Sequence, residues 1–213
     1  MPKVSVVMSV YNSENYVSKA IESILRQTFK DFEFIIINDG SSDNTLNILE
    51  EYGKNDNRIK ILNHQNKGLT KSLNIGIKAS KGKYIARQDD DDISLPQRLE
   101  KQVEFFDQND EIVLLGTNQY EITNENRTIG KYYDFKTINK IVYLINPISH
   151  TSAMFKRDVF LDIGSYNESF RTSQDFEVWM RLAKYGKISM LDKVLVERNI
   201  TADSISAQKK FIQ

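Results

Sequence analysis

The chain has 213 residues, of which 40% are hydrophobic and 27% are charged, values that fit one ordinary soluble domain, or two small ones at most. Its 29 Lys and Arg residues balance its 29 Asp and Glu residues, so the formal net charge is zero. This balance argues against a general nucleic-acid binder, which needs a basic face. Because the chain contains no cysteine, disulfides, cysteine-ligated metal centres and thiol nucleophiles are excluded.

The apolar segments are too short to cross a bilayer. The runs at residues 34–37 and 112–115 fall far short of the roughly 20 residues that a membrane-spanning helix needs. The apolar residues 4–10 are followed at once by polar residues and by no small-residue cleavage site, so we expect no signal peptide and a cytoplasmic protein. Residues 209–213 end the chain inside an amphipathic pattern. That pattern is compatible with a longer protein whose C-terminal segment associates with the cytoplasmic face of a membrane.

Strands and helices alternate through the first half of the chain. Residues 4–10 are apolar on both faces, which predicts a buried parallel strand, and residues 17–25 show a helical apolar spacing after a predicted N-cap at Ser13. The same reasoning predicts strands at 32–37, 59–62 and 84–86, and helices that start after Ser42 or Asp43, span 69–79, and begin at Pro96. This alternation predicts an α/β fold with one doubly wound, mostly parallel sheet.

The second half of the chain has a mixed pattern. Strands are predicted at 112–116, 151–155, 187–191 and 194–198, a hairpin over 118–132 with its turn at 124–126, and a helix over 175–185. No change in composition marks a linker. We therefore predict a single domain over residues 1–213 with two halves, about 1–92 and about 93–213.

Polar side chains follow three of the predicted strands directly. Tyr11 comes after the first strand, Asp39 after the second, and four aspartates at residues 89–92 after the fourth. Ligands of doubly wound sheets bind beyond the carboxyl ends of the strands, where the strand order reverses. We therefore expect these side chains to converge on one crevice.

The four consecutive aspartates repel one another, so their position needs an explanation. One interpretation is a solvated acidic loop. The other is a site for Mg²⁺ or Mn²⁺, because these ions prefer oxygen ligands and leave positions open for substrate phosphates. The chain has neither a Walker A loop nor a G-x-G-x-x-G motif, so a bound phosphate would need a metal as its counter-charge. Asp39 is typical of a turn, but at a strand end it could also accept a hydrogen bond from a base or a ribose.

Six segments together resemble the family 2 glycosyltransferases, which are inverting enzymes of the GT-A fold. The segments are residues 4–12 (VSVVMSVYN), 37–43 (INDGSSD), 66–69 (NKGL), 82–92 (GKYIARQDDDD), 146–152 (NPISHTS) and 174–179 (QDFEVW). The resemblance implies a nucleotide-sugar donor, a divalent cation (Mn²⁺ or Mg²⁺) and an acceptor hydroxyl on a glycan or a lipid-linked sugar. It makes about 1–92 the nucleotide-binding half and about 93–213 the acceptor and catalytic half.

The resemblance also implies roles for single residues of the nucleotide-binding half. Ser9 and Tyr11 match residues that contact the nucleotide base, Tyr11 by stacking. Asp39 matches the acid that pairs with uracil, which makes a UDP-sugar the expected donor. Glu14 is a further candidate nucleotide contact; the alternative is a first-turn acid that stabilises the helix dipole.

Within the aspartate run, Asp90 matches the residue that holds the ribose and Asp91 the residue that binds the metal. Asp89 is counted with the nucleotide contacts, but Asp89 and Asp91 also satisfy the Asp-x-Asp spacing of the family, so the metal register stays open by one residue. A small residue is commoner in the family at the position of Asp90.

Asp175 matches the catalytic base that takes the proton of the acceptor hydroxyl, although an acid at a helix start also has a structural role. The family often has Glu where Gln174 precedes it. Lys67, Arg87 and His150 are candidate active-site contacts, with ion pairing or a structural hydrogen bond as the alternative.

The expected function is a metal-dependent inverting transfer of a sugar from a UDP-sugar, in surface polysaccharide synthesis. Two alternatives remain open. A sugar nucleotidyltransferase would normally carry a Gly-rich, basic loop after the first strand, and a catalytically silent module would bind the sugar nucleotide without turnover. The donor sugar, the acceptor and the oligomeric state do not follow from the sequence.

Overall fold

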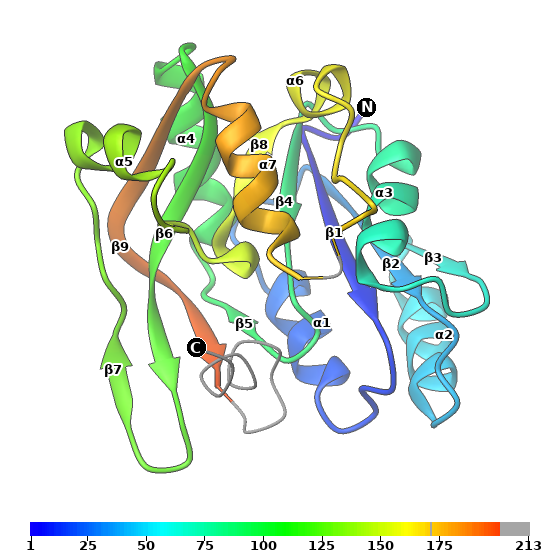
Figure 1. The fold of residues 1–213 in the computed structure, drawn as a ribbon. Helices are drawn as coiled ribbons and strands as arrows, with labels where there is room; N and C mark the ends of the chain where they lie inside the picture. Colours follow the sequence, from blue (N-terminus) through cyan, green and yellow to red (C-terminus); the bar gives the residue numbers. More distant parts are fainter. Residues whose placement is uncertain (171, 201–213) are drawn as a thin grey trace.

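A computed structural model of the chain describes residues 1–170 and 172–200, and within these residues nine strands form one sheet (Figure 1). The strand order is β3-β2-β1-β4-β8-β6-β9-β5, and β7 pairs with β6. The strands are β1 (Val4–Val10), β2 (Phe32–Asn38), β3 (Ile59–Asn63), β4 (Tyr84–Arg87), β5 (Ile93–Ser94), β6 (Ile112–Ile122), β7 (Arg127–Ile129), β8 (Met154–Lys156) and β9 (Lys187–Asn199).

The sheet is mostly parallel, as predicted. Strand β1 lies between β2 and β4 and is parallel to both, and β2 is parallel to β3. Strand order therefore reverses at β1, which places the predicted crevice at its carboxyl end. The second half is mixed, because β8 is antiparallel to β4 and β6, whereas β6 and β9 run parallel along most of their length.

Helices cover both faces of the sheet. Buried side chains of α1 (Val17–Leu25), α2 (Thr45–Asn55) and α4 (Arg98–Gln108) form a core with one face. The other face packs against α3 (Leu69–Ala79), α5 (Phe135–Ile141), α6 (Arg157–Asp162) and α7 (Gln174–Leu182). A short 3₁₀ helix, η1 (His150–Ser152), precedes β8.

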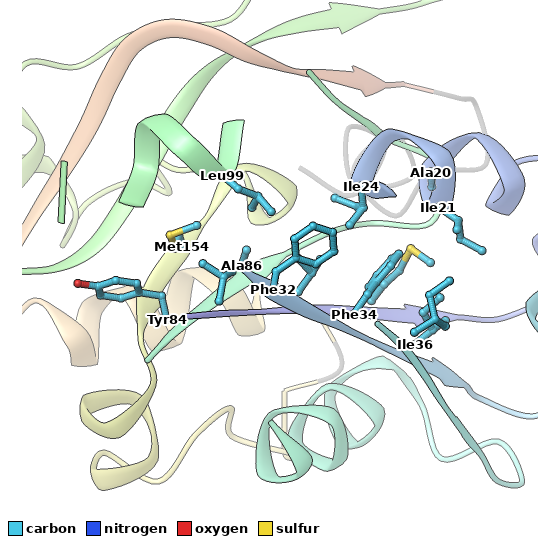
Figure 2. Packing of buried hydrophobic residues seen from close by; sticks show 14 of the residues in the cluster. Ala20, Ile21, Ile24, Phe32, Phe34, Ile36, Tyr84, Ala86, Leu99 and Met154 are labelled. Carbon is cyan, nitrogen blue, oxygen red and sulfur yellow. The ribbon is translucent and has the colours of Figure 1, made fainter. Parts of the chain in front are cut away.

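Alternate side chains of β2 pack into the hydrophobic cores on the two faces of the sheet. Phe34 and Ile36 point to the α1 side, where they pack with Ile21 and Ile24 (Figure 2), and Ile35 points to the α3 side. Each of these residues is fully buried, which stabilises the fold by about 1.5–3 kcal/mol per side chain. This double-sided burial explains why the segment reads as a continuous apolar run.

Three predicted helix starts are wrong. Helix α2 begins at Thr45 after Asn44, whereas the prediction placed its cap at Ser42 or Asp43. Helix α1 begins at Val17 after Tyr16, and Ser13 instead donates its backbone N–H to Thr45 Oγ1 at 2.8 Å, which joins two loops. Helix α4 begins at Arg98, because the carbonyl of Pro96 accepts a 2.8 Å hydrogen bond from the Thr28 N–H.

The second half differs more from its prediction. The strand predicted at 151–155 begins only at Met154, because the residues before it form η1. The two strands predicted at 187–191 and 194–198 are the single strand β9, whose pairing with β6 continues through shifts in register. Helix α5 was not predicted; it is short, and Asp134 caps it by accepting a 3.0 Å hydrogen bond from the Thr137 N–H.

In the part of the chain that the structure describes, no helix combines the length and the apolar character that a bilayer crossing requires. The amphipathic pattern at residues 209–213 lies outside the described residues.

Candidate active site

A cleft with a volume of about 1040 Å³ lies beyond the carboxyl ends of β1, β2 and β4. Both halves of the chain line it. The predicted site residues in its wall are Ser9, Tyr11, Asp39, Asp89, Asp90, Asp91, His150 and Asp175. The predicted convergence on one crevice is therefore what the structure shows, whereas Glu14, Lys67 and Arg87 lie outside the lining.

The loops that follow β1 and β2 hold each other in place. Asn12 has a left-handed backbone with φ of 50°, and its Oδ1 accepts a 2.8 Å hydrogen bond from the Ser42 N–H. Gly40 has φ of 76°, and a Cβ at this position would lie 2.5 Å from the backbone nitrogen of Asn66. Only glycine permits this close approach, which brings the segment after Asn66 over Asp39.

Backbone donors orient the carboxylate of Asp39. Its Oδ1 accepts a 2.7 Å hydrogen bond from the Lys67 N–H, and its Oδ2 accepts a 2.9 Å hydrogen bond from the Gly68 N–H. The residue is only 2% exposed, yet it lines the cleft. Lys67 therefore contributes a backbone donor to the site. The match of residues 66–69 to the family was the signal in the sequence, but it did not reveal this contact.

Glu14 precedes α1 in the chain, and its side chain contacts the start of α2. Its Oε2 accepts a 2.9 Å hydrogen bond from the Asn44 N–H, and its own N–H donates to Asp43 Oδ2 at 3.1 Å. The carboxylate thus stabilises the loop that leads into α2.

The four aspartates have different surroundings. Asp89 forms an ion pair with Arg87, and its N–H donates to Thr151 Oγ1 at 3.3 Å. Asp92 is 2% exposed, and its Oδ1 accepts a 2.8 Å hydrogen bond from the Asn199 N–H. The outer two aspartates are therefore anchored to the protein, and all four aspartates line the cleft.

The pKa values of the run reflect these surroundings. Burial by itself would raise the pKa of Asp89, but the adjacent Arg87 guanidinium holds it below the ordinary value. Burial and then repulsion from Asp91 and Asp89 raise the pKa of Asp90 to about 7, and burial followed by repulsion from Asp89 raises the pKa of Asp91 to about 6. A divalent cation would relieve this repulsion.

The donor set fits Mg²⁺ or Mn²⁺. The carboxylates of Asp90 and Asp91 are hard oxygen ligands, the kind that these ions prefer. Among the described residues, no three His, Asp or Glu side chains form a group that could hold a metal ion by themselves. An ion held by two carboxylates would also need oxygen atoms of a diphosphate, which is how Mg²⁺ usually binds in nucleotide sites.

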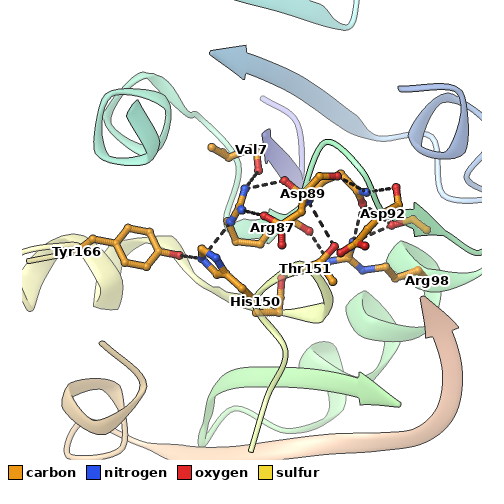
Figure 3. A network of polar contacts seen from close by, with 11 residues as sticks. Val7, Arg87, Asp89, Asp92, Arg98, His150, Thr151 and Tyr166 are labelled. Atoms are coloured by element: carbon orange, nitrogen blue, oxygen red, sulfur yellow. Dashed lines mark hydrogen bonds and ion pairs between the residues drawn. The ribbon is translucent and has the colours of Figure 1, made fainter. Parts of the chain in front are cut away.

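Arg87 lies beneath the aspartate run, away from the cleft surface (Figure 3). Its Nη1 donates to the carbonyls of Val7 and Gln88, both at 2.7 Å, and its Nε donates to His150 Nε2 at 3.1 Å. Its Nη2 pairs with Asp89, so this buried guanidinium contacts two residues of the cleft lining, His150 and Asp89.

A second buried arginine, Arg98, was not predicted as part of the site. Its guanidinium donates to Ser94 Oγ and to the carbonyl of Arg87, both at 2.7 Å. Burial and then the charge of Arg87 lower its pKa to about 9. In the sequence, Arg98 reads as a solvent-facing residue of an amphipathic helix, and only the fold places it under the aspartates.

His150 occupies the first position of η1. Its Nε2 lies 2.7 Å from the hydroxyl of Tyr166 as well as 3.1 Å from Arg87 Nε (Figure 3). Its ring meets those of Tyr166 and Trp179 edge-on. Burial and then the charge of Arg87 lower the pKa of His150 to about 4. The imidazole is therefore neutral at neutral pH.

Asp175 lies in the first turn of α7. Its Oδ2 accepts a 2.6 Å hydrogen bond from Asn146 Nδ2, and Trp179 of the same helix donates from Nε1 to the Ile148 carbonyl at 3.3 Å. The helix and the segment before η1 are thus tied together on the side of the cleft that the second half of the chain forms.

Known sequences match this chain over most of its length. The profile of the family "Glycosyl transferase family 2" matches residues 5–164. The O-antigen biosynthesis glycosyltransferase WbnJ of Escherichia coli is 40% identical over 183 residues, which cover 84% of this chain and 71% of WbnJ. The uncharacterized glycosyltransferase MJ1057 of Methanocaldococcus jannaschii is 37% identical over 207 residues, which cover 93% of this chain and 71% of that protein.

Solved structures show the same fold. S. aureus TarS in complex with UDP has a TM-score of 0.79 at 22% identity, over 94% of this chain and 61% of that chain. The mannosyltransferase PcManGT from Pyrobaculum calidifontis, in complex with GDP-Man and Mn²⁺, has a TM-score of 0.79 at 13% identity, over 98% of this chain and 60% of that chain. The chain thus spans about 60% of these solved chains and has the GT-A fold that the sequence predicted. The chain belongs to glycosyl transferase family 2, and the protein is a glycosyltransferase.

Proposed function

We propose that this glycosyltransferase moves a sugar from a UDP-sugar to a hydroxyl of a glycan or a lipid-linked sugar, with the help of a divalent cation and with inversion at the anomeric carbon. One observation carries the proposal. The cleft brings Asp90 and Asp91, at the end of a strand in the first half, together with Asp175, on a helix of the second half. Such a cleft has one wall for a diphosphate and one wall for an acceptor.

The first half supports a uridine nucleotide. Tyr11 is 52% exposed at the cleft, where its ring is free to stack on a base. Asp39 is fixed by two backbone N–H groups, so its carboxylate can serve only as an acceptor toward the base. The N3–H of uracil is a donor of the required kind, and N3 of cytosine is not. TarS, which shares the fold, was solved with UDP.

The aspartate run supports a requirement for metal. Asp91 and Asp90 are the residues that would hold the ion, whereas Asp89 pairs with Arg87 and Asp92 accepts from the Asn199 N–H. A bound divalent cation would supply positive charge to the leaving diphosphate. The ordinary partner of a sugar diphosphate in proteins without a glycine cradle is such an ion, and PcManGT was solved with Mn²⁺.

Asp175 supports an inverting transfer. Its carboxylate lines the cleft and would take the proton of the acceptor hydroxyl while that oxygen attacks the anomeric carbon from the face opposite the diphosphate. A single displacement of this kind inverts the configuration, so an α-linked donor gives a β-linked product. Holding donor and acceptor in one cleft supplies further rate through orientation.

The acceptor is proposed to belong to a surface polysaccharide. WbnJ, which is 40% identical to this chain, bears the name of an O-antigen biosynthesis enzyme. The lining of the second half is polar and aromatic, with Glu121, Lys131 and Tyr133 from the β6–β7 region, as suits the hydroxyl-rich face of a sugar.

The test is a donor screen. UDP-, GDP- and CDP-sugars are incubated with the protein, with oligosaccharide acceptors and with either Mn²⁺ or EDTA, and nucleotide release and product mass are measured. We expect transfer from a UDP-sugar in Mn²⁺, and none in EDTA or with Asp175→Asn. Tight UDP binding without transfer to any acceptor or to water would instead point to a silent binding module.

A further inference from the structure

The hydrogen bonds around His150 fix the position of its ring proton. Arg87 Nε is a donor in every protonation state of the protein, and it points at His150 Nε2 from 3.1 Å. That nitrogen must therefore carry a lone pair. The Tyr166 hydroxyl, 2.7 Å from the same nitrogen, then donates as well. Since the ring is neutral, its single proton lies on Nδ1.

Nδ1 is open to the cleft. It forms no hydrogen bond with any described residue, and within residues 1–170 and 172–200 the single buried side-chain polar atom without a partner is Gln119 Oε1. Nδ1 is therefore not buried, and the cleft is the space that His150 lines. Asp89 and Asp175 both lie near enough to His150 to act on the charge of its ring.

We propose that the Nδ1–H of His150 donates a hydrogen bond to the diphosphate oxygen that leaves with the nucleotide. This inference deepens the proposed function and rests on it. As the bond between the anomeric carbon and that oxygen breaks, its electron pair stays on the oxygen, and the acceptor proton goes to Asp175. The histidine transfers no proton; it stabilises the growing negative charge as a fixed donor.

The same geometry makes Arg87 a positioning residue. Its Nε holds the tautomer of His150, and its Nη2 holds Asp89. One guanidinium thus aligns a neutral donor and an acid in the wall of the same cleft. Because Nε2 of His150 is already engaged by two donors, that nitrogen is not available as a metal ligand.

Imidazole ¹⁵N NMR tests the tautomer independently of catalysis. The chain has two histidines, and His64→Gln identifies the signals of His150. We expect the Nδ1–H tautomer at pH 7 in the free protein, and a downfield shift of that proton when UDP and the diamagnetic ion Mg²⁺ are added. An Nε2–H tautomer, a charged ring, or a proton that does not respond to UDP and Mg²⁺ would overturn the proposal.

Two matched variants test the role in transfer. The amide nitrogen of Asn occupies a position close to Nδ1 of histidine, and that of Gln a position close to Nε2. We expect His150→Asn to keep transfer within about tenfold of the unmodified protein, and His150→Gln and His150→Ala to lose roughly 10²–10³-fold, the usual effect of removing one such donor. UDP affinity in Mn²⁺, measured on each variant by calorimetry, should change far less than transfer.

The outcomes separate the two proposals. Transfer by the unmodified protein with His150→Gln more active than His150→Asn, or with all three variants as active as the unmodified protein, would overturn the role of Nδ1 and leave the proposed function intact. No transfer by the unmodified protein with any donor would remove the proposed function and this inference together. Melting temperatures of all variants show whether a loss reflects unfolding instead.

Discussion

Asn146 donates a 2.6 Å hydrogen bond from its side-chain amide to Oδ2 of Asp175. The two residues come from different elements, the segment before η1 and the first turn of α7. The bond engages one oxygen of the carboxylate and leaves the other for an acceptor hydroxyl. It joins two of the segments that carry the family resemblance, residues 146–152 and 174–179, although the sequence assigned Asn146 no role.

Removing this bond should impair transfer more than donor binding. In Asn146→Ala, Asp175 loses the donor that orients it, and a hydrogen bond to a charged group contributes about 1.5–3 kcal/mol. We expect transfer to fall by about ten- to a hundredfold with UDP affinity nearly unchanged. Initial rates at saturating donor and calorimetry with UDP measure the two effects. An equal loss of transfer rate and UDP affinity would mean that Asn146 contributes to nucleotide binding and not to the orientation of Asp175.

Asp175→Asn is the direct test of the base. The amide can still turn its oxygen toward Asn146, but it cannot take a proton. Transfer should therefore fall by roughly 10²–10⁴, the usual contribution of a positioned general base, whereas UDP and Mn²⁺ bind as before. Near-normal transfer by the folded variant would remove Asp175 from the mechanism.

The structure supplies a matched control for this variant. Glu177 is in the same helix turn, but it pairs with Arg181 at 2.7 Å and lies outside the cleft lining. Glu177→Gln should leave transfer within a few-fold of the unmodified protein and should lower the melting temperature slightly, because the pair with Arg181 is partly exposed.

The third prediction concerns the identity of the nucleotide base. With Asp39 limited to the role of an acceptor, UDP should bind at least about tenfold more tightly than CDP, the value of one lost charge-assisted hydrogen bond. Competition calorimetry in Mn²⁺ measures the ratio. Equal affinities would show that Asp39 does not read the base and only closes the loop over residues 66–68.

The fourth prediction concerns Asp91. In Asp91→Asn the site loses a charged oxygen ligand, so UDP affinity should fall in Mn²⁺ and change little in EDTA. Uridine is the control ligand, because it lacks the diphosphate and should bind equally well with and without metal. If UDP binds the unmodified protein equally in Mn²⁺ and EDTA, the aspartate run has another purpose.

The first half of the fold could be predicted closely, and the second could not, for a physical reason. Strands β1 and β2 are buried on both faces, so their residues are uniformly apolar and polar residues mark their ends. Strand β9 contains Asp192 and Lys193 in its middle, which read as a break, yet pairing with β6 keeps the strand extended. Short elements such as η1 and α5 depend on local hydrogen bonds that periodicity does not reveal.

The candidate site could likewise be predicted only in part. The aspartates could be placed because they come directly after a strand, and chain order fixes which edge of the sheet they reach. Their partners could not be placed, because the contacts join distant residues: Arg87 meets His150 from 63 positions away, and Asn146 meets Asp175 from 29. A buried arginine and a solvated one look alike in the sequence.

The raised pKa values of the aspartate run make the stability of the metal-free protein depend on pH. The folded pKa of Asp90 is about 7 and that of Asp91 about 6, against an ordinary value of 3.8. Between these values the folded state binds more protons than the unfolded state, so these two groups lower stability as pH rises from about 4 to about 7. His150 acts in the opposite direction up to about pH 6.5, because its folded pKa is lowered to about 4.

The contributions of Asp90 and His150 to the pH dependence of stability can therefore be separated by the choice of pH and by a variant. Above pH 6.5 the histidine no longer contributes, so in EDTA the melting temperature should fall between pH 6.5 and pH 8. Asp90→Asn keeps the shape of the protonated acid, so it should match the unmodified protein at pH 5 and exceed its melting temperature at pH 8. Mn²⁺ at pH 8 should raise the melting temperature of the unmodified protein and raise that of the variant less, because the ion relieves a repulsion that the variant lacks. Identical melting curves for the two proteins at both pH values would show that Asp90 is not held among repelling carboxylates.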